Sequence, residues 1–131
     1  MADRTVTFRK YERLCSKKAI EKLFEKGTFF TCKFFQVIWS YNSDTELPSP
    51  ARVAISVSKK SFKSSVKRNI VKRRIREAYR RKKYILYDFL TSQNISIIFI
   101  IIYKDSQLLC YQEIEKAVEE TIQKLISSLR S

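Results

Sequence analysis

Residues 52–80 read RVAISVSKKSFKSSVKRNIVKRRIREAYR, and the hydrophobic pattern of this stretch changes along its length. Its first part alternates apolar with small or polar residues at Val53, Ile55 and Val57, which predicts a half-buried strand. Residues 65–84 are strongly basic and carry apolar residues at helical spacing, which predicts a helix. A strand and a basic helix joined by a short loop therefore form the centre of the predicted fold.

The predicted helix has an apolar stripe with basic residues on both sides. On a helical wheel the stripe that packs on the sheet is formed by Val71, Ile75, Ala78 and Tyr79. The cations beside it stand at i, i+4 spacing: Arg68, Lys72, Arg76 and Arg80. Each like-charge pair at this spacing costs about 0.2–0.5 kcal/mol, and a single acid, Glu77, relieves the repulsion. This cost favours nucleic-acid binding over a merely solvated face or a nuclear localisation patch.

The net charge of the chain is concentrated in the same region. The 131 residues include 27 Lys and Arg and 13 Asp and Glu, which gives a net charge of +14. Residues 59–83 contain 13 of the cations and one acid, so this window carries +12 and the rest of the chain +2. A domain this basic usually binds a polyanion.

Three absences limit the chemistry that the chain can perform. It has no histidine, which removes Ser-His-Asp and Cys-His sites and the usual general base near neutral pH. A single glycine, Gly27, excludes phosphate-binding loops that need at least two. The three cysteines, Cys15, Cys32 and Cys110, lack CxxC spacing, which argues against a zinc cluster or a disulfide framework and suggests a reducing compartment. We therefore assign no catalytic and no metal-binding residue.

The longest apolar run, residues 95–103, is much shorter than the roughly 20 residues of a membrane helix. The first ten residues are polar and mixed, unlike a signal peptide. We expect a cytoplasmic protein. A role at a membrane is not expected, because the fold needs the apolar stripe of the basic helix and leaves none of it to bind lipid.

The chain length fits one domain over residues 1–131. Helices and strands alternate irregularly, which predicts an α+β fold or a two-layer α/β sandwich. The predicted elements are a helix from Ser16 to Lys26 that stops at Gly27, a strand over 33–41, a loop over 42–50, a strand over 52–58, the basic helix over 65–84, a buried strand over 95–103, and an amphipathic helix over 111–129.

The aromatic strand over 33–41 offers a second nucleic-acid surface. A period of two places Phe35, Val37, Trp39 and Tyr41 on one face, which we expect to be core, and Phe34, Gln36, Ile38 and Ser40 on the other. Aromatic residues on an exposed strand suit stacking on unpaired bases. A helix that reads DNA usually follows another helix, whereas a strand precedes this one, so RNA is favoured over DNA.

The strand and basic helix within residues 53–80 resemble a family, the protein component of bacterial ribonuclease P. The segment VAISVSKK followed by KRNIVKRRIREAYR is similar to the family's strand ending in Val-Ser-Lys-Lys and its helix motif Arg-Asn-Arg-x-Lys-Arg-x-x-Arg-Glu. The matching positions are Val57, Ser58, Lys59, Lys60, Arg68, Asn69, Lys72, Arg73, Arg76 and Glu77. The FEKG segment at 24–27 and the YQE segment at 111–113 resemble the family by order and spacing, so the resemblance covers about residues 8–128.

The resemblance implies the element order αβββαβα with a left-handed crossover, similar to the second domain of ribosomal protein S5, so a third strand is expected within residues 28–58. It also implies a ribonucleoprotein endonuclease whose RNA subunit, with Mg²⁺, removes the 5′ leader of precursor tRNA. The expected partners are this RNA and precursor tRNA, bound by a monomer in a 1:1 complex. A ribosomal-type RNA-binding protein is the main alternative, and a DNA-binding regulator is a weaker one.

Two sets of site residues follow from this resemblance and the charge pattern. The RNA subunit is expected to bind Arg68, Asn69, Lys72, Arg73, Arg76 and Arg80. The leader is expected in a groove formed by Phe24, Phe34, Gln36, Ile38, Lys59 and Lys60. The chain departs from the family at Ile70, where an arginine is usual, so that an RNA contact is lost or is taken over by Arg74 or Lys67. It also has Ile38 where the family often has an aromatic facing the groove.

Overall fold

The computed structural model describes residues 10–42 and 49–130, and it confirms the mixed α+β class predicted from the sequence. The third strand expected within residues 28–58 is present as β1. The elements are η1 (Lys10–Glu12), α1 (Lys17–Lys26), β1 (Thr28–Cys32), β2 (Phe35–Tyr41), β3 (Ala51–Val57), α2 (Ser65–Gln93), β4 (Ile97–Tyr103) and α3 (Tyr111–Arg130). Most of residues 42–50, predicted to be a loop, lie outside the described residues.

The four strands form one sheet in the order β1-β2-β4-β3. The β1–β2 and β2–β4 pairs are antiparallel, whereas β3 and β4 are parallel neighbours. Because parallel neighbours need a connection that crosses the sheet, α2 forms the crossover between them. At the carboxyl ends of this pair Val57 lies opposite Tyr103, so the segments that follow the two strands begin side by side.

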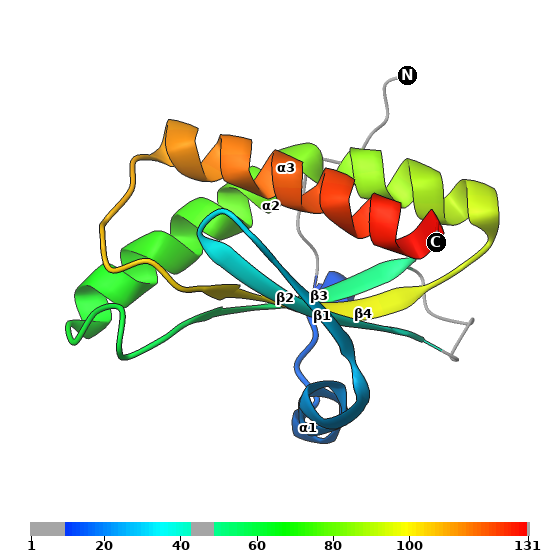
Figure 1. Ribbon diagram of the computed structural model, residues 1–131, viewed down its shortest axis with the longest axis horizontal. Helices are drawn as coiled ribbons and strands as arrows, with labels where there is room; N and C mark the ends of the chain where they lie inside the picture. The colour runs from blue at the N-terminus through cyan, green and yellow to red at the C-terminus, as the bar shows by residue number, and fades with distance from the viewer. Residues whose placement is uncertain (1–9, 43–48, 131) are drawn as a thin grey trace.

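Helices cover both faces of the sheet. Figure 1 shows α2 and α3 together on one face and α1 alone on the other. The principal core lies between the sheet and the pair α2 and α3, and the apolar stripe predicted for the basic helix is fully buried in it. A smaller core under α1 contains Leu14, Leu23, Ile38, Ile100 and Ile102. The two-layer prediction therefore holds for the principal core, and α1 adds a partial third layer.

The turn between β1 and β2 explains why β2 begins later than predicted. Lys33 adopts a positive φ of 56°, a backbone conformation that residues other than glycine rarely adopt. Thr31 pairs with Gln36 and Cys32 with Phe35, so the tight turn consists of Lys33 and Phe34 alone. The residues predicted to open the strand at 33 therefore form the turn instead.

Helix α2 continues nine residues beyond the predicted end at 84. Leu86 and Leu90 are fully buried and extend its apolar stripe along the sheet. The helix ends at Asn94, whose left-handed backbone (φ 55°, ψ 45°) lets its N–H donate to the carbonyls of the last turn. Within residues 10–42 and 49–130 no helix is both long and apolar enough to cross a membrane.

Both predicted ends of α1 are confirmed. The Ser16 hydroxyl accepts a hydrogen bond from the Ala19 N–H at 3.2 Å, as an N-cap residue does. At the other end the Gly27 N–H donates to the Leu23 carbonyl. A Cβ atom on Gly27 would lie 2.5 Å from that carbonyl oxygen and 2.6 Å from Ile38 Cγ2. Glycine is therefore required here because α1 approaches β2 closely, although its φ of −75° is open to any residue.

A buried ion pair fixes the N-terminal segment to α2. Lys83 Nζ lies 2.5 Å from Glu12 Oε1, and the Tyr87 hydroxyl donates to the same oxygen at 2.6 Å. Both charged residues are almost fully buried, at 3% and 2% exposure. The next residues run along the edge of β3, where the Leu14 N–H donates to the Val53 carbonyl at 2.9 Å. Lys83 therefore holds the chain in place at the start of α1.

Candidate nucleic-acid interface

The loop before α2 is ordered by the first turn of the helix. Ser64 caps α2, because its hydroxyl accepts from the Lys67 N–H at 3.3 Å. The Arg68 guanidinium donates to the carbonyls of Phe62 (2.8 Å) and Lys63 (3.1 Å), which folds the loop back onto the helix. Arg68, predicted to bind RNA, is thus half-buried and also shapes the loop that carries Lys59, Lys60 and Lys63.

The N-terminal half of α2 presents cations that meet no acidic partner within residues 10–42 and 49–130. Asn69, Arg73 and Arg76 are exposed, and Lys72 is half-buried. No ion pair joins these cations to any carboxylate in the described part of the chain. Five of the six residues predicted to bind the RNA subunit therefore lie together on this half, which we define as residues 65–76 and call the open half.

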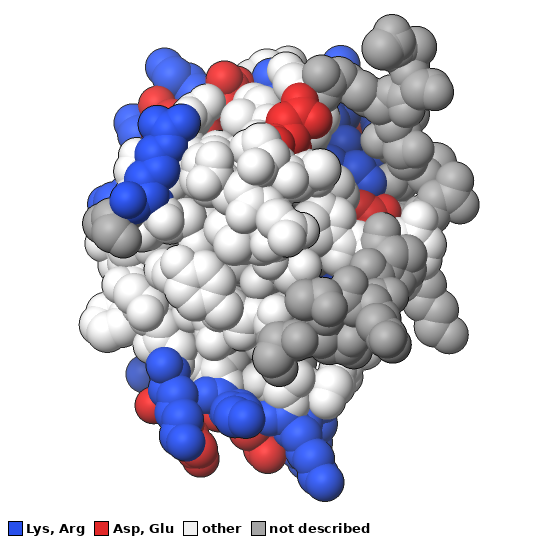
Figure 2. Space-filling view, turned by 90° about the vertical axis from the view of Figure 1, so that its right-hand side faces the viewer, with Lys and Arg blue, Asp and Glu red and all other residues white. Residues whose placement is uncertain are grey.

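The C-terminal half of α2, residues 77–93, is neutralised by carboxylates, and we call it the paired half. Arg80, the sixth predicted residue, binds Glu77 through two hydrogen bonds of 2.5 and 2.9 Å. This hydrogen bond from Arg80 holds the pKa of Glu77 below its ordinary value. Two further cations face acids of α3: Arg81–Glu115 at 3.9 Å and Lys82–Glu119 at 3.2 Å. Figure 2, which faces the end of the molecule where α2 finishes, shows a broad uncharged centre between charged groups above and below.

Ile70, where the family usually has an arginine, lies in the open half and is half-buried. Arg74, one of the two residues considered as its replacement, donates to the Leu109 carbonyl at 2.5 Å and ties α2 to the segment before α3. Lys67 is exposed, and its side chain makes no such contact with the part of the chain that the structure describes. Of the two alternatives, the geometry therefore favours Lys67.

The residues predicted to line the leader groove do not lie on one surface. Ile38 is 7% exposed and packs beneath α1 with Leu23 and Ile100, so its predicted place in an open groove is wrong. The register shows why, because Ile38 is opposite Ile100, and Gly27 brings α1 directly over this pair. Gln36, one row further along the same face, is half-buried and lies opposite Ile102.

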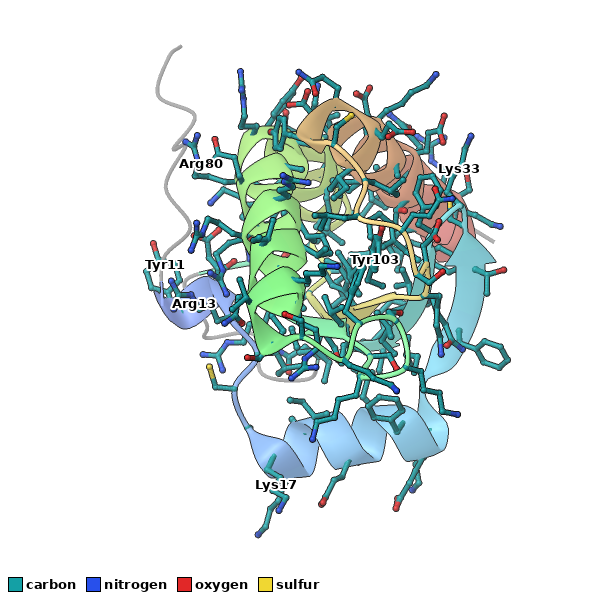
Figure 3. All side chains as sticks on the ribbon, turned by 90° about the vertical axis from the view of Figure 1, so that its left-hand side faces the viewer. Tyr11, Arg13, Lys17, Lys33, Arg80 and Tyr103 are labelled. Atoms are coloured by element: carbon teal, nitrogen blue, oxygen red, sulfur yellow. The ribbon has the colours of Figure 1, made fainter. Side chains whose placement is uncertain are left out.

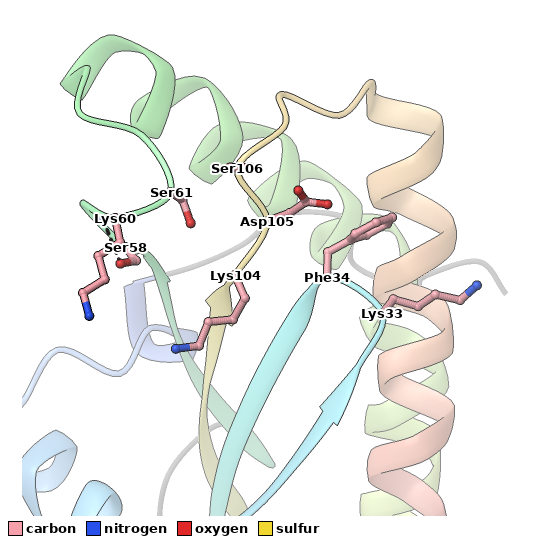
Figure 4. Close-up of a pocket in the computed structure, with 8 residues that line it drawn as sticks. All are labelled: Lys33, Phe34, Ser58, Lys60, Ser61, Lys104, Asp105 and Ser106. Atoms are coloured by element: carbon pink, nitrogen blue, oxygen red, sulfur yellow. Dashed lines mark hydrogen bonds between the residues drawn. The ribbon is translucent and has the colours of Figure 1, made fainter.

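Phe34 and Phe24 lie on different sides of the sheet. Phe34 packs against the principal core, on the side of α3, and Figure 4 shows its ring directed toward that helix. Its predicted place beside Gln36 is therefore wrong, because the alternation of β2 begins only after the turn at Lys33. Phe24 is on α1, where its side chain is 54% exposed.

A hollow of about 430 Å³ lies at the carboxyl ends of β3 and β4. Its lining comes from three loops and comprises Lys33, Phe34, Ser58, Lys60, Ser61, Lys104, Asp105 and Ser106 (Figure 4). The Lys60 N–H donates to Ser58 Oγ at 3.0 Å, and the Lys104 N–H donates to the Phe34 carbonyl at 2.8 Å. Lys60 therefore lies in a site with two further lysines, whereas Lys59 is exposed on the same loop outside the lining.

Lys104 was not identified from the sequence, although a signal for it exists. It directly follows β4, as Ser58 directly follows β3, and the two strands are parallel neighbours in register. Parallel strands bring the residues after them to one edge of the sheet. Beneath this edge, burial raises the pKa of Tyr103 to about 12, and its hydroxyl donates to the Gln107 carbonyl at 2.6 Å. Tyr103 is therefore a neutral structural residue.

The arrangement suits binding of a polyanion rather than proton transfer. Its functional groups are mainly lysine and arginine side chains, with the exposed amide of Asn69 and the half-buried amide of Gln36. The hollow adds serine hydroxyls and one carboxylate, that of Asp105, beside its three lysines. Over residues 10–42 and 49–130, no group of three or more acidic or thiol side chains is placed to hold a metal ion. Guanidinium groups bind phosphate through two parallel hydrogen bonds and ammonium groups bind it as point charges.

Comparison with known proteins connects this geometry to a family. The model of the family described as Ribonuclease P matches residues 8–126. A ribonuclease P protein component of Porphyromonas gingivalis is 30% identical over 122 residues, covering 93% of this chain and 88% of the relative. A ribonuclease P protein component of Petrotoga mobilis is 38% identical over 86 residues, covering 63% and 69%.

Solved structures show the same fold. A ribonuclease P protein mutant of Staphylococcus aureus, described as defective in mRNA degradation activity, superposes with a TM-score of 0.69 at 23% identity, covering 88% of this chain and 89% of the other. The ribonuclease P protein of Thermotoga maritima gives a TM-score of 0.68 at 19% identity, covering 86% and 96%. The family model and the Porphyromonas gingivalis relative both match nearly the whole chain. The chain therefore belongs to the family of bacterial ribonuclease P protein components.

Proposed function

We propose that this protein is the RNA-binding subunit of a ribonuclease P that removes the 5′ leader from precursor tRNA. The observation that carries the proposal is the open half of α2, where Lys72, Arg73 and Arg76 stand without an acidic partner in the described chain. Bound phosphates relieve the repulsion between these neighbouring cations. The partners are the RNA subunit and precursor tRNA, bound in the cytoplasm by one copy of the protein.

The RNA subunit docks on the open half in this proposal. Arg73 and Arg76 extend into solvent and bind phosphate, while Asn69 adds an amide that donates and accepts. Arg68 contributes mainly by ordering the loop, since its guanidinium already donates to two carbonyls. Arg80 contributes least, because Glu77 occupies its guanidinium.

The 5′ leader lies along the lysine-lined hollow at the end of the sheet. Lys60 and Lys104 neutralise its phosphates, and the partly exposed row that contains Gln36 continues the surface toward α1. Phe24, exposed at the end of α1, offers a ring for stacking on a base. Contacts of this type depend little on base identity, which suits leaders of varied sequence.

The chemistry of cleavage is assigned to the RNA subunit and its Mg²⁺. The chain has no histidine, so no side chain has an ordinary pKa near neutrality that could serve as general base. The protein contributes positive charge, which lowers phosphate repulsion where the two RNAs meet. It therefore reduces the Mg²⁺ concentration that cleavage requires.

The test is cleavage of a precursor tRNA by the matching RNA subunit at low Mg²⁺, with and without the protein. We expect the protein to restore cleavage that the RNA alone does not sustain, and to cleave nothing by itself. Binding should depend strongly on salt, because six to ten phosphate contacts lose about 10³–10⁵ in affinity between 50 and 200 mM. If the protein binds both RNAs and alters neither rate nor Mg²⁺ demand, a ribosomal-type RNA-binding role replaces the proposal.

A further inference from the structure

A second basic hollow, which shares no lining residue with the surfaces described above, lies beside the start of α1. Its volume is about 430 Å³, and its lining residues are Tyr11, Arg13, Cys15, Ser16 and Arg52. They come from the segment between η1 and α1 and from β3. The lining contains two arginines and no carboxylate.

Arg52 is placed in this hollow with an unsatisfied donor. Its Nε is completely buried and has no hydrogen-bond partner within the described residues. A buried donor without an acceptor costs about 1–3 kcal/mol, and more for a charged group. Because this nitrogen lies beneath the surface of the hollow, an anion bound to the guanidinium can reach it only if the Arg52 side chain turns toward the hollow, and the hydrogen bond then formed would remove that cost.

The walls of the hollow are held rigidly, so the site is built before a ligand arrives. On one side the Leu14 N–H bonds to the Val53 carbonyl, which fixes Arg13 beside the strand that carries Arg52. On the other side the buried Glu12–Lys83 pair anchors the preceding turn. A preformed pocket binds without the entropic cost of ordering its side-chain supports.

The start of α1 adds to the positive potential. Ser16 is its N-cap, and its first turn contains no acid but does contain Lys17. The free N–H groups of a helix N-terminus attract anions, and this effect adds to the two guanidinium charges. Helix terminus, arginine pair and buried donor therefore all favour the same kind of ligand.

We propose that this hollow binds a backbone phosphate of the RNA subunit, as an RNA contact separate from the open half of α2. The proposal rests on the proposed function, because the phosphate belongs to the same RNA. Figure 3 shows Arg80, Tyr11, Arg13 and Lys17 along one side of the molecule, from the paired half of α2 to the start of α1. The hollow therefore lies on the same side as α2, and an RNA that docks on α2 can also reach this flank.

The experiment follows the Arg52 Nε–H signal by NMR in the full-length protein, and separately measures affinity for the RNA subunit. Addition of inorganic phosphate, and of the RNA subunit, should each shift the Arg52 signal. Arg52→Gln should weaken RNA binding about three- to tenfold and lower the salt slope by about one. Lys22→Gln is the matched control, because it removes one charge from an exposed position of α1 outside the lining and should change affinity less than twofold.

The variants decide whether the hollow binds the RNA subunit. If Arg52→Gln fails to fold, Arg52→Lys retains the charge but removes the buried Nε, and it should still lose phosphate binding. If Arg52→Gln and Lys22→Gln bind RNA equally well, or if inorganic phosphate shifts the Arg52 signal and the RNA subunit does not, the hollow is not an RNA contact. Arg73→Gln on the open half separates the two proposals: its loss of affinity with none for Arg52→Gln overturns this inference alone, whereas no loss for either variant overturns the proposed function.

Discussion

The two halves of α2 both carry clustered cations, but their surroundings differ. Both carry a dense series of cations beside one apolar stripe. In the paired half Arg80, Arg81 and Lys82 each meet a carboxylate, and Lys83 is buried against Glu12. In the open half Lys72, Arg73 and Arg76 meet none in the described chain. Charge alone therefore does not identify an RNA surface, because the packing of neighbouring elements decides which cations remain available.

The largest effect should come from the buried cation of the paired half. Lys83→Met leaves the Glu12 carboxylate buried without its counter-ion, which costs about 3–5 kcal/mol of the free energy of unfolding. Lys82→Met is the matched control, since it breaks a partly exposed pair worth about 0–1 kcal/mol. Urea denaturation measures both values. Equal destabilisation by the two variants would show that Lys83 is not a structural residue of the fold.

The next effect concerns RNA affinity and compares equivalent substitutions in the two halves. Arg73→Glu should weaken binding of the RNA subunit about tenfold, roughly 1.4 kcal/mol, because it reverses an unpaired charge facing phosphate. Arg81→Glu makes the same charge change at a residue that is also exposed but already faces Glu115. It should change affinity about threefold or less. Filter binding at several salt concentrations measures both, and the same loss for both variants would remove the distinction between the halves.

Much of this division could be predicted from the sequence, but the partners could not. Helical spacing correctly identified the buried stripe of α2, and the motif around Arg68 and Asn69 lies within the open half. The pairing of Arg81 with Glu115 depends on how α3 packs beside α2, which no local pattern encodes. For this reason Arg80 was grouped with the RNA-binding residues although Glu77, three positions before it, holds its side chain.

The errors at the leader groove have the same origin. Period two correctly separated the two faces of β2, but it contains no information about what covers each face. Gly27 allows α1 to lie on Ile38, which removes that residue from the surface. The positive φ of Lys33 forms a tight turn, which takes Phe34 out of the strand and directs it toward α3. Lysine rarely adopts this conformation, so the sequence does not predict the turn.

A smaller gain of affinity should follow when the open half receives one more cation. Ile70→Arg restores the residue that the family resemblance implies and places it within a turn of Lys67 and Arg73. We expect RNA affinity to rise about two- to fivefold and the salt slope to increase by about one. Ile70→Gln controls for the loss of the half-buried aliphatic side chain. An unchanged salt slope in Ile70→Arg would mean that position 70 does not face RNA.

The smallest effect lies at the boundary between the halves, where Glu77 binds Arg80. The hydrogen bond from Arg80 lowers the pKa of Glu77 below its ordinary value of 4.5, so the unfolded chain binds this proton more readily than the folded protein. The pair therefore stabilises the fold fully above pH 4.5, and this contribution is lost as the pH falls through the lower folded-state pKa. Because both side chains are partly exposed, the contribution is below about 1 kcal/mol.

Glu77→Gln and Arg80→Gln should each flatten the decline of unfolding free energy between pH 5 and pH 3, and the double variant should flatten it no further. If the curve of Glu77→Gln runs parallel to that of the unmodified protein, the pair does not contribute to the stability of the fold.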